Sequence, residues 1–106
     1  MITAKFYNDE HKKMLGFHVS GHAGYADIGN DIACASVSSA VMMTANAVTE
    51  VFGLEAKVRV TENEIMLKLG EDADGIGDKL MLSLLMQLDM LSDEFPGCIR
   101  IENKQV

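Results

Sequence analysis

The sequence predicts an α+β fold, in which a mainly antiparallel sheet carries two helices on one face. Several short segments alternate between apolar and polar residues, as strands do when one face is buried. Two longer segments repeat apolar residues at spacings of three and four, the period of a helix packed on a core. These segments follow one another in the order β-β-α-β-β-α-β. Because each strand has a single apolar face, both helices are expected to cover that face.

The first two strands are expected to form a hairpin. The segments ITAKFY and MLGFHVSGH both alternate, and the polar segment NDEHKK between them is typical of a turn. On the second strand, His18 and His22 fall on the face opposite the apolar residues. The residues predicted to face the core are Ile2, Ala4, Phe6, Leu15, Phe17 and Val19.

The first helix is expected over residues 32–52, and Gly53 is its natural stop. Two more strands follow in the segment EAKVRVTENEIMLKLG, around a turn at Glu62 and Asn63. The helix residues predicted to face the core are Val37, Val41, Thr44, Val48 and Val51. The inward residues predicted for the two strands are Ala56, Val58, Val60, Ile65, Leu67 and Leu69.

The second helix is expected over residues 71–95, with acidic residues in its first turn, where the helix dipole favours negative charge. Pro96 and Gly97 end this helix. The segment CIRIE then forms the last strand, with Ile99 and Ile101 facing inward.

This second helix has two apolar stripes. The first stripe consists of Leu80, Leu84, Leu88, Leu91 and Phe95. The second consists of Leu82, Met86 and Met90. Deep burial within the monomer and a contact between two copies both explain a second stripe. Because two helices and one sheet leave little protein to cover it, we favour a homodimer.

The chain of 106 residues suits one domain spanning residues 1–106, and no repeat or linker is evident. No apolar run approaches the ~20 residues that cross a bilayer, and the N-terminus lacks the features of a signal peptide. We therefore expect a cytoplasmic protein with no membrane partner, in which Cys34 and Cys98 are thiols. The formal net charge of −7 argues against direct binding to nucleic acid and is compatible with a basic protein partner.

The stretch SGHAGYADIGNDIACASVSSA, residues 20–40, carries candidate chemistry. His22 lies just past the end of a strand, Cys34 lies in the first turn of the expected helix, and a glycine-containing loop joins them. Unpaired N–H groups and the helix dipole stabilise a thiolate at a helix start, and they also stabilise a developing oxyanion. A nearby imidazole stabilises the thiolate and later protonates a leaving amine. Such residues are the parts of a thiol acyl-transfer site.

The pattern alone leaves a simpler interpretation open, in which Cys34 is a small buried apolar residue and His22 a surface or turn residue. Asp31 also has two interpretations, as the N-cap of the helix or as the acid that orients His22. Ser38 lies one turn after Cys34, where it bonds back to the Cys34 carbonyl or polarises the site. Cys98 is interpreted as structural, because no histidine or acid lies near it in a catalytic spacing.

Neither a metal nor a cofactor is expected. Zinc sites commonly use close pairs of ligands, and the sequence has no CxxC, HxxxH or HxxE spacing around His22 and Cys34. The glycines of the loop do not form a phosphate-binding loop either, because no GxxxxGK[ST] motif is present.

Residues 20–40 resemble the signature of the bacterial ribosomal-processing cysteine protease family (Prp-like), known from Firmicutes and related bacteria. That signature is Gly-His-Ala, a glycine-containing loop, and then Gly-x-Asp-Ile-x-Cys-Ala-x-x-Ser. The matching residues are Gly21, His22, Ala23, Gly29, Asp31, Ile32, Cys34, Ala35 and Ser38. The chain length and the element order also fit, so the resemblance covers essentially the whole chain.

The resemblance implies a homodimeric α+β cysteine peptidase, with Cys34 as nucleophile and His22 as base. Asp31 and Ser38 match motif positions and would support them. The loop from 23 to 30 would cover the substrate. The residues assigned to substrate contact are Gly21, Ala23, Gly24 and Gly29.

The implied substrate is large-subunit ribosomal protein twenty-seven, from which the family removes a short N-terminal extension just before the mature N-terminus. Two alternatives to this peptidase stay open. One is a non-enzymatic acidic dimer that binds a basic ribosomal protein or an assembly factor. The other is acyl transfer from the same thiol to an acceptor other than water.

Overall fold

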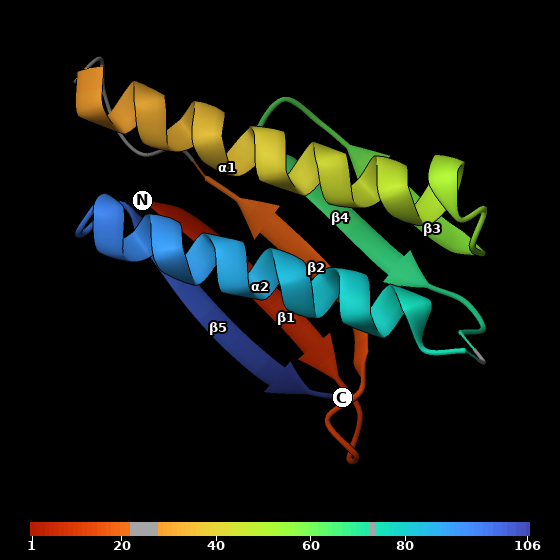
Figure 1. Cartoon of the computed structure of the whole chain (residues 1–106). Helices are drawn as coiled ribbons and strands as arrows, with labels where there is room; N and C mark the ends of the chain where they lie inside the picture. Colours follow the sequence, from red (N-terminus) through yellow and green to blue (C-terminus); the bar gives the residue numbers. More distant parts are fainter. Residues whose placement is uncertain (22–27, 73) are drawn as a thin grey trace.

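The computed structural model describes residues 1–21, 28–72 and 74–106, without the side chains of residues 28–31. These residues form a five-stranded sheet and two α-helices that lie side by side on one of its faces (Figure 1). In chain order the elements are β1 (Ile2–Asn8), β2 (Met14–Ser20), α1 (Ile28–Asn46), a π-helical turn (Ala47–Val51), β3 (Ala56–Val60), β4 (Glu64–Leu69), α2 (Ile76–Glu94) and β5 (Ile99–Gln105).

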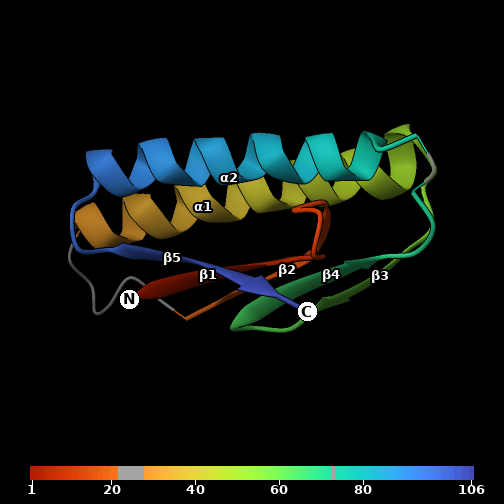
Figure 2. The same cartoon turned by 90° about the horizontal axis from the view of Figure 1, so that it is seen from below.

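The strands are arranged in the order β3-β4-β2-β1-β5. The pairing of β1 with β5 is parallel and the other pairings are antiparallel, so the predicted α+β class and the mainly antiparallel sheet are confirmed. Both helices form one layer above the sheet, as Figure 2 shows. Among the described residues, no helix covers the opposite face of the sheet.

The core lies between the helix layer and the sheet. Phe6 of β1 and Phe17 of β2 are directly paired and fully buried, with their ring centroids 6.3 Å apart. Such contacts between large apolar side chains contribute most of the burial energy of a small domain. The other large and fully buried side chains are Leu67, Met81, Leu88, Val41 and Val48.

A β-bulge corrects the predicted inward face of β2. Tyr7 pairs with Gly16, but the next pair joins Asn8 to Met14, which leaves Leu15 as the extra residue of the strand. Met14 is consequently buried in the core, while Leu15 is only half-buried and lines a pocket on the other side of the sheet. The prediction that Leu15 faces the core is therefore wrong.

The first helix begins four residues earlier than expected, at Ile28 instead of Ile32, and its last turn is a π-helix. The backbone N–H of Phe52 donates to the carbonyl of Ala47, five residues before it. This wider turn rotates the following residues away from the core, because it inserts one extra residue. The prediction that Val51 faces the core is wrong for this reason, since Val51 is 74% exposed.

Helix α1 also corrects the expectation that no segment is apolar enough to cross a bilayer. Residues Ile32–Val51 reach the length and mean hydropathy, 1.4, of a membrane-crossing helix. This is weak support for a membrane span, because the core helix of a soluble protein meets the same criteria. One side of α1 is in fact packed into the core through Ala33, Val37, Val41 and Ala45.

Strand β3 is less buried than its alternation predicts. Val58 and Val60 point to the same side of the sheet as buried Leu67, with which Val58 is paired, yet they are 40% and 55% exposed. The reason is the place of β3 at the edge of the sheet. Val58 and Val60 therefore point toward the core side of the sheet as predicted, but they are not buried there.

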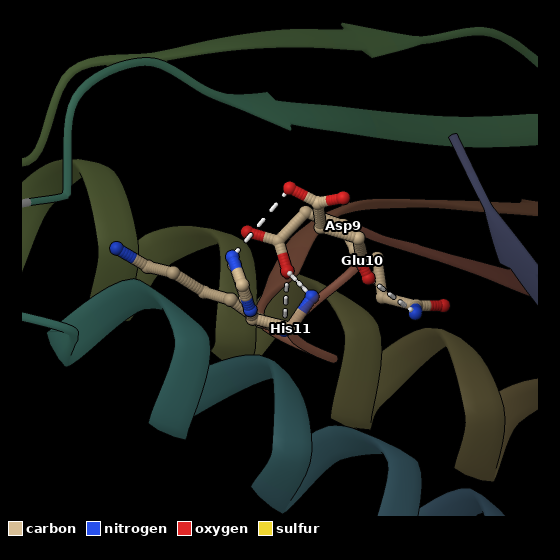
Figure 3. Close-up of polar contacts among 5 residues, drawn as sticks. Asp9, Glu10 and His11 are labelled. Carbon is tan, nitrogen blue, oxygen red and sulfur yellow. Dashed lines mark hydrogen bonds and ion pairs between the residues drawn. The ribbon is translucent and has the colours of Figure 1, made fainter.

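The turn between β1 and β2 is held by Asp9. Its Oδ1 accepts the backbone N–H groups of His11 at 2.8 Å and Lys13 at 2.9 Å (Figure 3). The pKa of the Asp9 carboxyl lies below its ordinary value, chiefly because of the hydrogen bond from Lys13. The seven residues of β2 separate this turn from Gly21, a distance of about 20 Å at the usual rise of a strand. His11 is therefore remote from the far end of β2.

The acidic residues before α2 lie outside the helix, because α2 begins at Ile76 and not near residue 71. Asp72 nevertheless binds the helix start: its Oδ1 accepts the N–H of Gly77 and its Oδ2 accepts the N–H of Asp78, both at 3.0 Å. Gly75, in the N-cap position, has no side chain that does this. Asp72 thus satisfies two of the unpaired N–H groups of α2 from the preceding loop.

The two predicted stripes of α2 differ in burial, and the alternative of deep burial of the second stripe within the monomer is wrong. Leu84, Leu88 and Leu91 of the first stripe are buried. Met86 and Met90 of the second stripe are 62% and 65% exposed. Within the described residues, the second stripe is therefore not covered by this chain.

We expect Asp72→Ala to lower the free energy of unfolding by about 1 kcal/mol, because two N–H groups at the start of α2 lose their acceptor. Urea denaturation followed by circular dichroism measures this loss. Asp74→Ala is the matched control, since Asp74 is an exposed acid in the same loop. Equal stabilities of the two variants would contradict the role of Asp72.

Candidate functional site

A cavity of about 200 Å³ lies beside Cys34, between α1 and the turn that joins β3 to β4. Its residues come from three parts of the fold. Its apolar surface is formed by Ile2, Val19, Val37, Val41 and Ile65. Its polar and small residues are Gly21, Cys34, Ser38, Thr61, Glu62, Asn63 and Glu64. A cysteine on the wall of such a cavity can meet a bound ligand, which a cysteine packed within the core cannot.

Cys34 lies on the border of the buried stripe of α1. Its neighbour Ala33 is fully buried, and Val37 three residues later is almost so, while Cys34 itself is half-buried. Cys34 and Cys98, both within the described residues, are not joined by a disulfide. The interpretation of Cys34 as a wholly buried apolar residue is therefore not supported.

The early start of α1 changes the expected environment of the thiol. Cys34 is the seventh residue of the helix and lies in its second turn, not in the first turn as predicted. The unpaired N–H groups belong to the first four residues, and the dipole effect declines within the first turn. The helix start therefore assists a thiolate at Cys34 less than the sequence indicated.

Asp31 and Gly29 both lie inside α1. Asp31 is the fourth helical residue, so the prediction that it is the N-cap is wrong, because an N-cap precedes the first helical residue. Gly29 is likewise helical and not part of the covering loop. The role of the Asp31 side chain toward His22 stays a prediction, because His22, Ala23, Gly24 and the Asp31 side chain lie outside the described structure.

Ser38 lines the same cavity as Cys34, one helical turn further on, as expected from the spacing. Thr44 and Thr49 bond back to the carbonyl four residues earlier. For Ser38, the bond back to the Cys34 carbonyl and the role in polarising the site both stay predictions. Ser38 is exposed where it lines the cavity.

Gly21 ends β2 at the edge of this cavity, and its backbone requires a glycine. Its φ is +90°, and a Cβ at this position would lie 2.5 Å from the carbonyl oxygen of Met1. The N–H of Gly21 donates to the carbonyl of Asn63 at 3.1 Å. This bond joins the end of β2, immediately before His22 in the sequence, to the β3–β4 turn.

The β3–β4 turn forms the wall opposite Cys34, a role that the sequence pattern did not indicate. Its residues Thr61, Glu62, Asn63 and Glu64 all line the cavity. They lie there because β4 is the neighbour of β2, so the start of β4 is level with the end of β2. The only available signal was the polar turn itself, since strand order is a property of the folded sheet.

Glu64 connects this turn to the outer face of the sheet. The Nε2 of His18 donates to one carboxylate oxygen of Glu64 at 2.9 Å, and Arg59 donates to the other at 3.3 Å. The hydrogen bond from His18, with smaller contributions from Arg59, holds the pKa of Glu64 below its ordinary value. His18 therefore lies on the outer sheet face, as predicted. It forms a hydrogen bond there with Glu64, which is also one of the residues that line the cavity.

The site as described offers a thiol and a hydroxyl from one helix, an apolar surface beneath them and a polar turn opposite. An apolar surface with a few polar groups at its edge is suited to binding a peptide side chain. A thiol at such a cavity is placed for nucleophilic attack on a bound carbonyl.

Comparisons with known proteins agree with this chemistry. The model of the family described as Cysteine protease Prp matches residues 1–100. The chain is 26% identical to the Ribosomal processing cysteine protease Prp of Bacillus subtilis strain 168, over 95% of this chain and 96% of that protein. The structure is similar to that of the ribosomal processing protease Prp from S. aureus with a covalently linked product peptide. The TM-score is 0.88 at 20% identity, covering 98% of this chain and 100% of that chain.

The same S. aureus protease in complex with a substrate peptide gives a TM-score of 0.88 at 19% identity, again over 98% of this chain and 100% of that chain. These two structural similarities concern the fold. The match to the family model concerns the sequence and spans nearly all of it.

We expect His18→Ala to raise the pKa of Glu64 toward its ordinary value, because the variant removes the hydrogen bond that lowers it most. Carboxyl-detected NMR titration measures this change. Because the folded-state pKa is depressed, the bonded carboxylate stabilises the fold above its unfolded pKa, and this stabilisation is lost as the pH falls through the folded value. His11→Ala is the control, as His11 lies in the distant turn. An unchanged Glu64 titration in His18→Ala would contradict the assignment.

Proposed function

Because the chain belongs to the Prp family of cysteine proteases, we propose that it removes the short N-terminal extension of large-subunit ribosomal protein twenty-seven, with Cys34 as nucleophile and His22 as base. The observation that carries this proposal is the position of Cys34 on a cavity beside Gly21, the residue that precedes His22 in the chain. The Bacillus subtilis relative bears the name of a ribosomal processing protease, which supports a ribosomal substrate. The family assignment favours this activity over the non-enzymatic binding module.

The proposed reaction has two stages. His22 takes the proton of the Cys34 thiol, and the sulfur forms a bond to the scissile carbonyl carbon as the carbonyl π electrons move to oxygen. Backbone N–H groups in the first turn of α1 stabilise that oxyanion. The tetrahedral species then expels the amine, which receives its proton from His22. Water hydrolyses the thioester in the second stage and restores the thiol.

Ser38 and Asp31 support this reaction in different ways. Ser38 presents its hydroxyl one turn beyond Cys34, where it can bond to the bound substrate. Asp31 orients His22 by accepting a ring N–H.

The net charge of −7 suits the proposed substrate. Ribosomal proteins are basic, and long-range attraction between opposite charges speeds encounter. A ribosomal substrate also places the reaction in the cytoplasm.

We further propose that the protein is a homodimer. Leu82, Met86 and Met90, the second stripe of α2, are exposed on the helix layer, and Met43 of α1 in the same layer is exposed as well. Exposed apolar side chains that gather on one face favour a contact with another protein surface. A symmetric pair of helix layers would cover both copies of this face.

We expect Cys34→Ala to abolish removal of the extension, because no other group replaces the attacking sulfur. Incubation of the purified protein with the extended ribosomal protein, read by intact mass spectrometry, measures the cleavage. Cys98→Ala is the matched control and should cleave normally, since Cys98 lies outside the cavity. Cleavage by Cys34→Ala at the rate of the unmutated protein would refute the proposed nucleophile.

We expect Met86→Asp combined with Met90→Asp to convert the dimer to a monomer, because two buried charges without partners oppose association. Size-exclusion chromatography with light scattering gives the mass. Val106→Asp is the control, because Val106 is similarly exposed but lies beside the pocket on the opposite face of the sheet. A monomeric unmutated protein would exclude the dimer at the outset.

A further inference from the structure

Two acidic residues of the β3–β4 turn, Glu62 and Glu64, line the Cys34 cavity, and the surroundings of their carboxylates differ. Glu64 accepts hydrogen bonds from His18 and Arg59, so groups of this chain already occupy both of its oxygens. Glu62 is exposed and lines the same cavity. Within residues 1–21, 28–72 and 74–106, no hydrogen bond or ion pair engages its carboxylate. Among the described residues, the turn therefore presents one carboxylate that the chain engages and one that it does not.

The backbone on each side of Glu62 is held in place. The N–H of Thr61 donates to the carbonyl of Glu64 at 2.9 Å, and the carbonyl of Asn63 accepts the N–H of Gly21 at 3.1 Å. The side chain of Glu62 thus projects from a turn that is bonded both to itself and to the end of β2. Its charge is held at the cavity without a rearrangement of the turn.

The charge of Glu62 is not balanced inside the cavity. None of the described residues that line it is a lysine or an arginine. Arg59, on the adjoining strand β3, is bonded to Glu64. Beside a low-dielectric apolar surface, an unbalanced carboxylate concentrates the field at the mouth of a site and attracts cations.

We infer that Glu62 is a specificity-determining residue, which selects peptides that carry a lysine or arginine close to the scissile bond. The inference rests on the proposed peptidase activity and goes beyond it, by assigning a charge preference to one residue of the β3–β4 turn. In this arrangement, one side chain of the peptide occupies the apolar surface. A neighbouring cationic side chain pairs with Glu62 at the edge of the cavity.

A peptide series tests this inference. Its members span the junction between extension and mature ribosomal protein, and each has lysine, norleucine or glutamate at one position near the scissile bond. For the unmutated protein, we expect kcat/KM to be about two- to fivefold higher with lysine than with norleucine at one position, as for an exposed charge pair. Glu62→Gln should abolish that preference, and Glu62→Lys should transfer it to glutamate. The preference should also weaken as salt is added.

Glu71→Gln is the matched control, because it removes the same charge from an exposed residue outside the cavity. It should keep the lysine preference. A lysine preference that survives unchanged in Glu62→Gln, or its absence in the unmutated protein, overturns the inference while leaving the peptidase activity intact.

The proposed function fails separately, if the unmutated protein cleaves none of the peptides. In that case, fluorescence anisotropy measures the affinity of Cys34→Ala for each labelled peptide, and a comparison of these affinities tests the charge preference without cleavage. Tighter binding of the lysine peptide that is lost in Cys34→Ala/Glu62→Gln supports the role of Glu62. Equal binding of all peptides, or no binding, overturns it.

Discussion

The packing of α1 on the sheet is the constraint on which the site depends. Ala33, Val37 and Val41 are buried against the core and determine the rotation of the helix about its axis. Successive helical residues are about 100° apart, so Cys34 and Ser38 necessarily fall beside this buried stripe. A different rotation would bury the thiol in the core or turn it toward solvent. The apolar residues of α1 therefore have a catalytic consequence, although none of them takes part in the proposed chemistry.

The fold class was predictable because apolar residues repeat in each element with the period of a strand or a helix, and this repeat shows which side is buried. The predictions of inward-facing residues are wrong where the backbone departs from a regular strand or helix. The bulge at Leu15 and the π-helical turn before Phe52 each add one residue, so the period on one side of that point is out of step with the period on the other. Gly16 borders the bulge and is of a residue type that marks irregular strands, whereas no glycine or proline lies within Ala47–Val51. The exposure of Val58 and Val60 had a different cause, because edge position is decided by strand order.

The site was predictable in part for a related reason. Gly21, Cys34 and Ser38 are close in sequence, and the end of β2 and helix α1 bring them to one place. The β3–β4 turn is distant in sequence, and only the pairing of β4 with β2 brings it to Gly21. The early start of α1 was also hidden, because the side chains of its first turn show no apolar stripe. It moved Cys34 into the second turn, so in the proposed mechanism more of the thiol activation falls to His22.

Two parts of the chain with different structural roles thus form the cavity. The groups proposed to react belong to the segment around α1, whose geometry is tied to the core through Ala33 and Val37. The opposite wall belongs to a turn whose side chains are exposed and do not support the core. Core positions tolerate few substitutions, because changes of volume there lower stability, whereas exposed turn positions tolerate many. If Glu62 selects the charge of the substrate as inferred, substitutions there would change that preference without moving the thiol. Substrate selection could then vary while the proposed chemistry stays fixed.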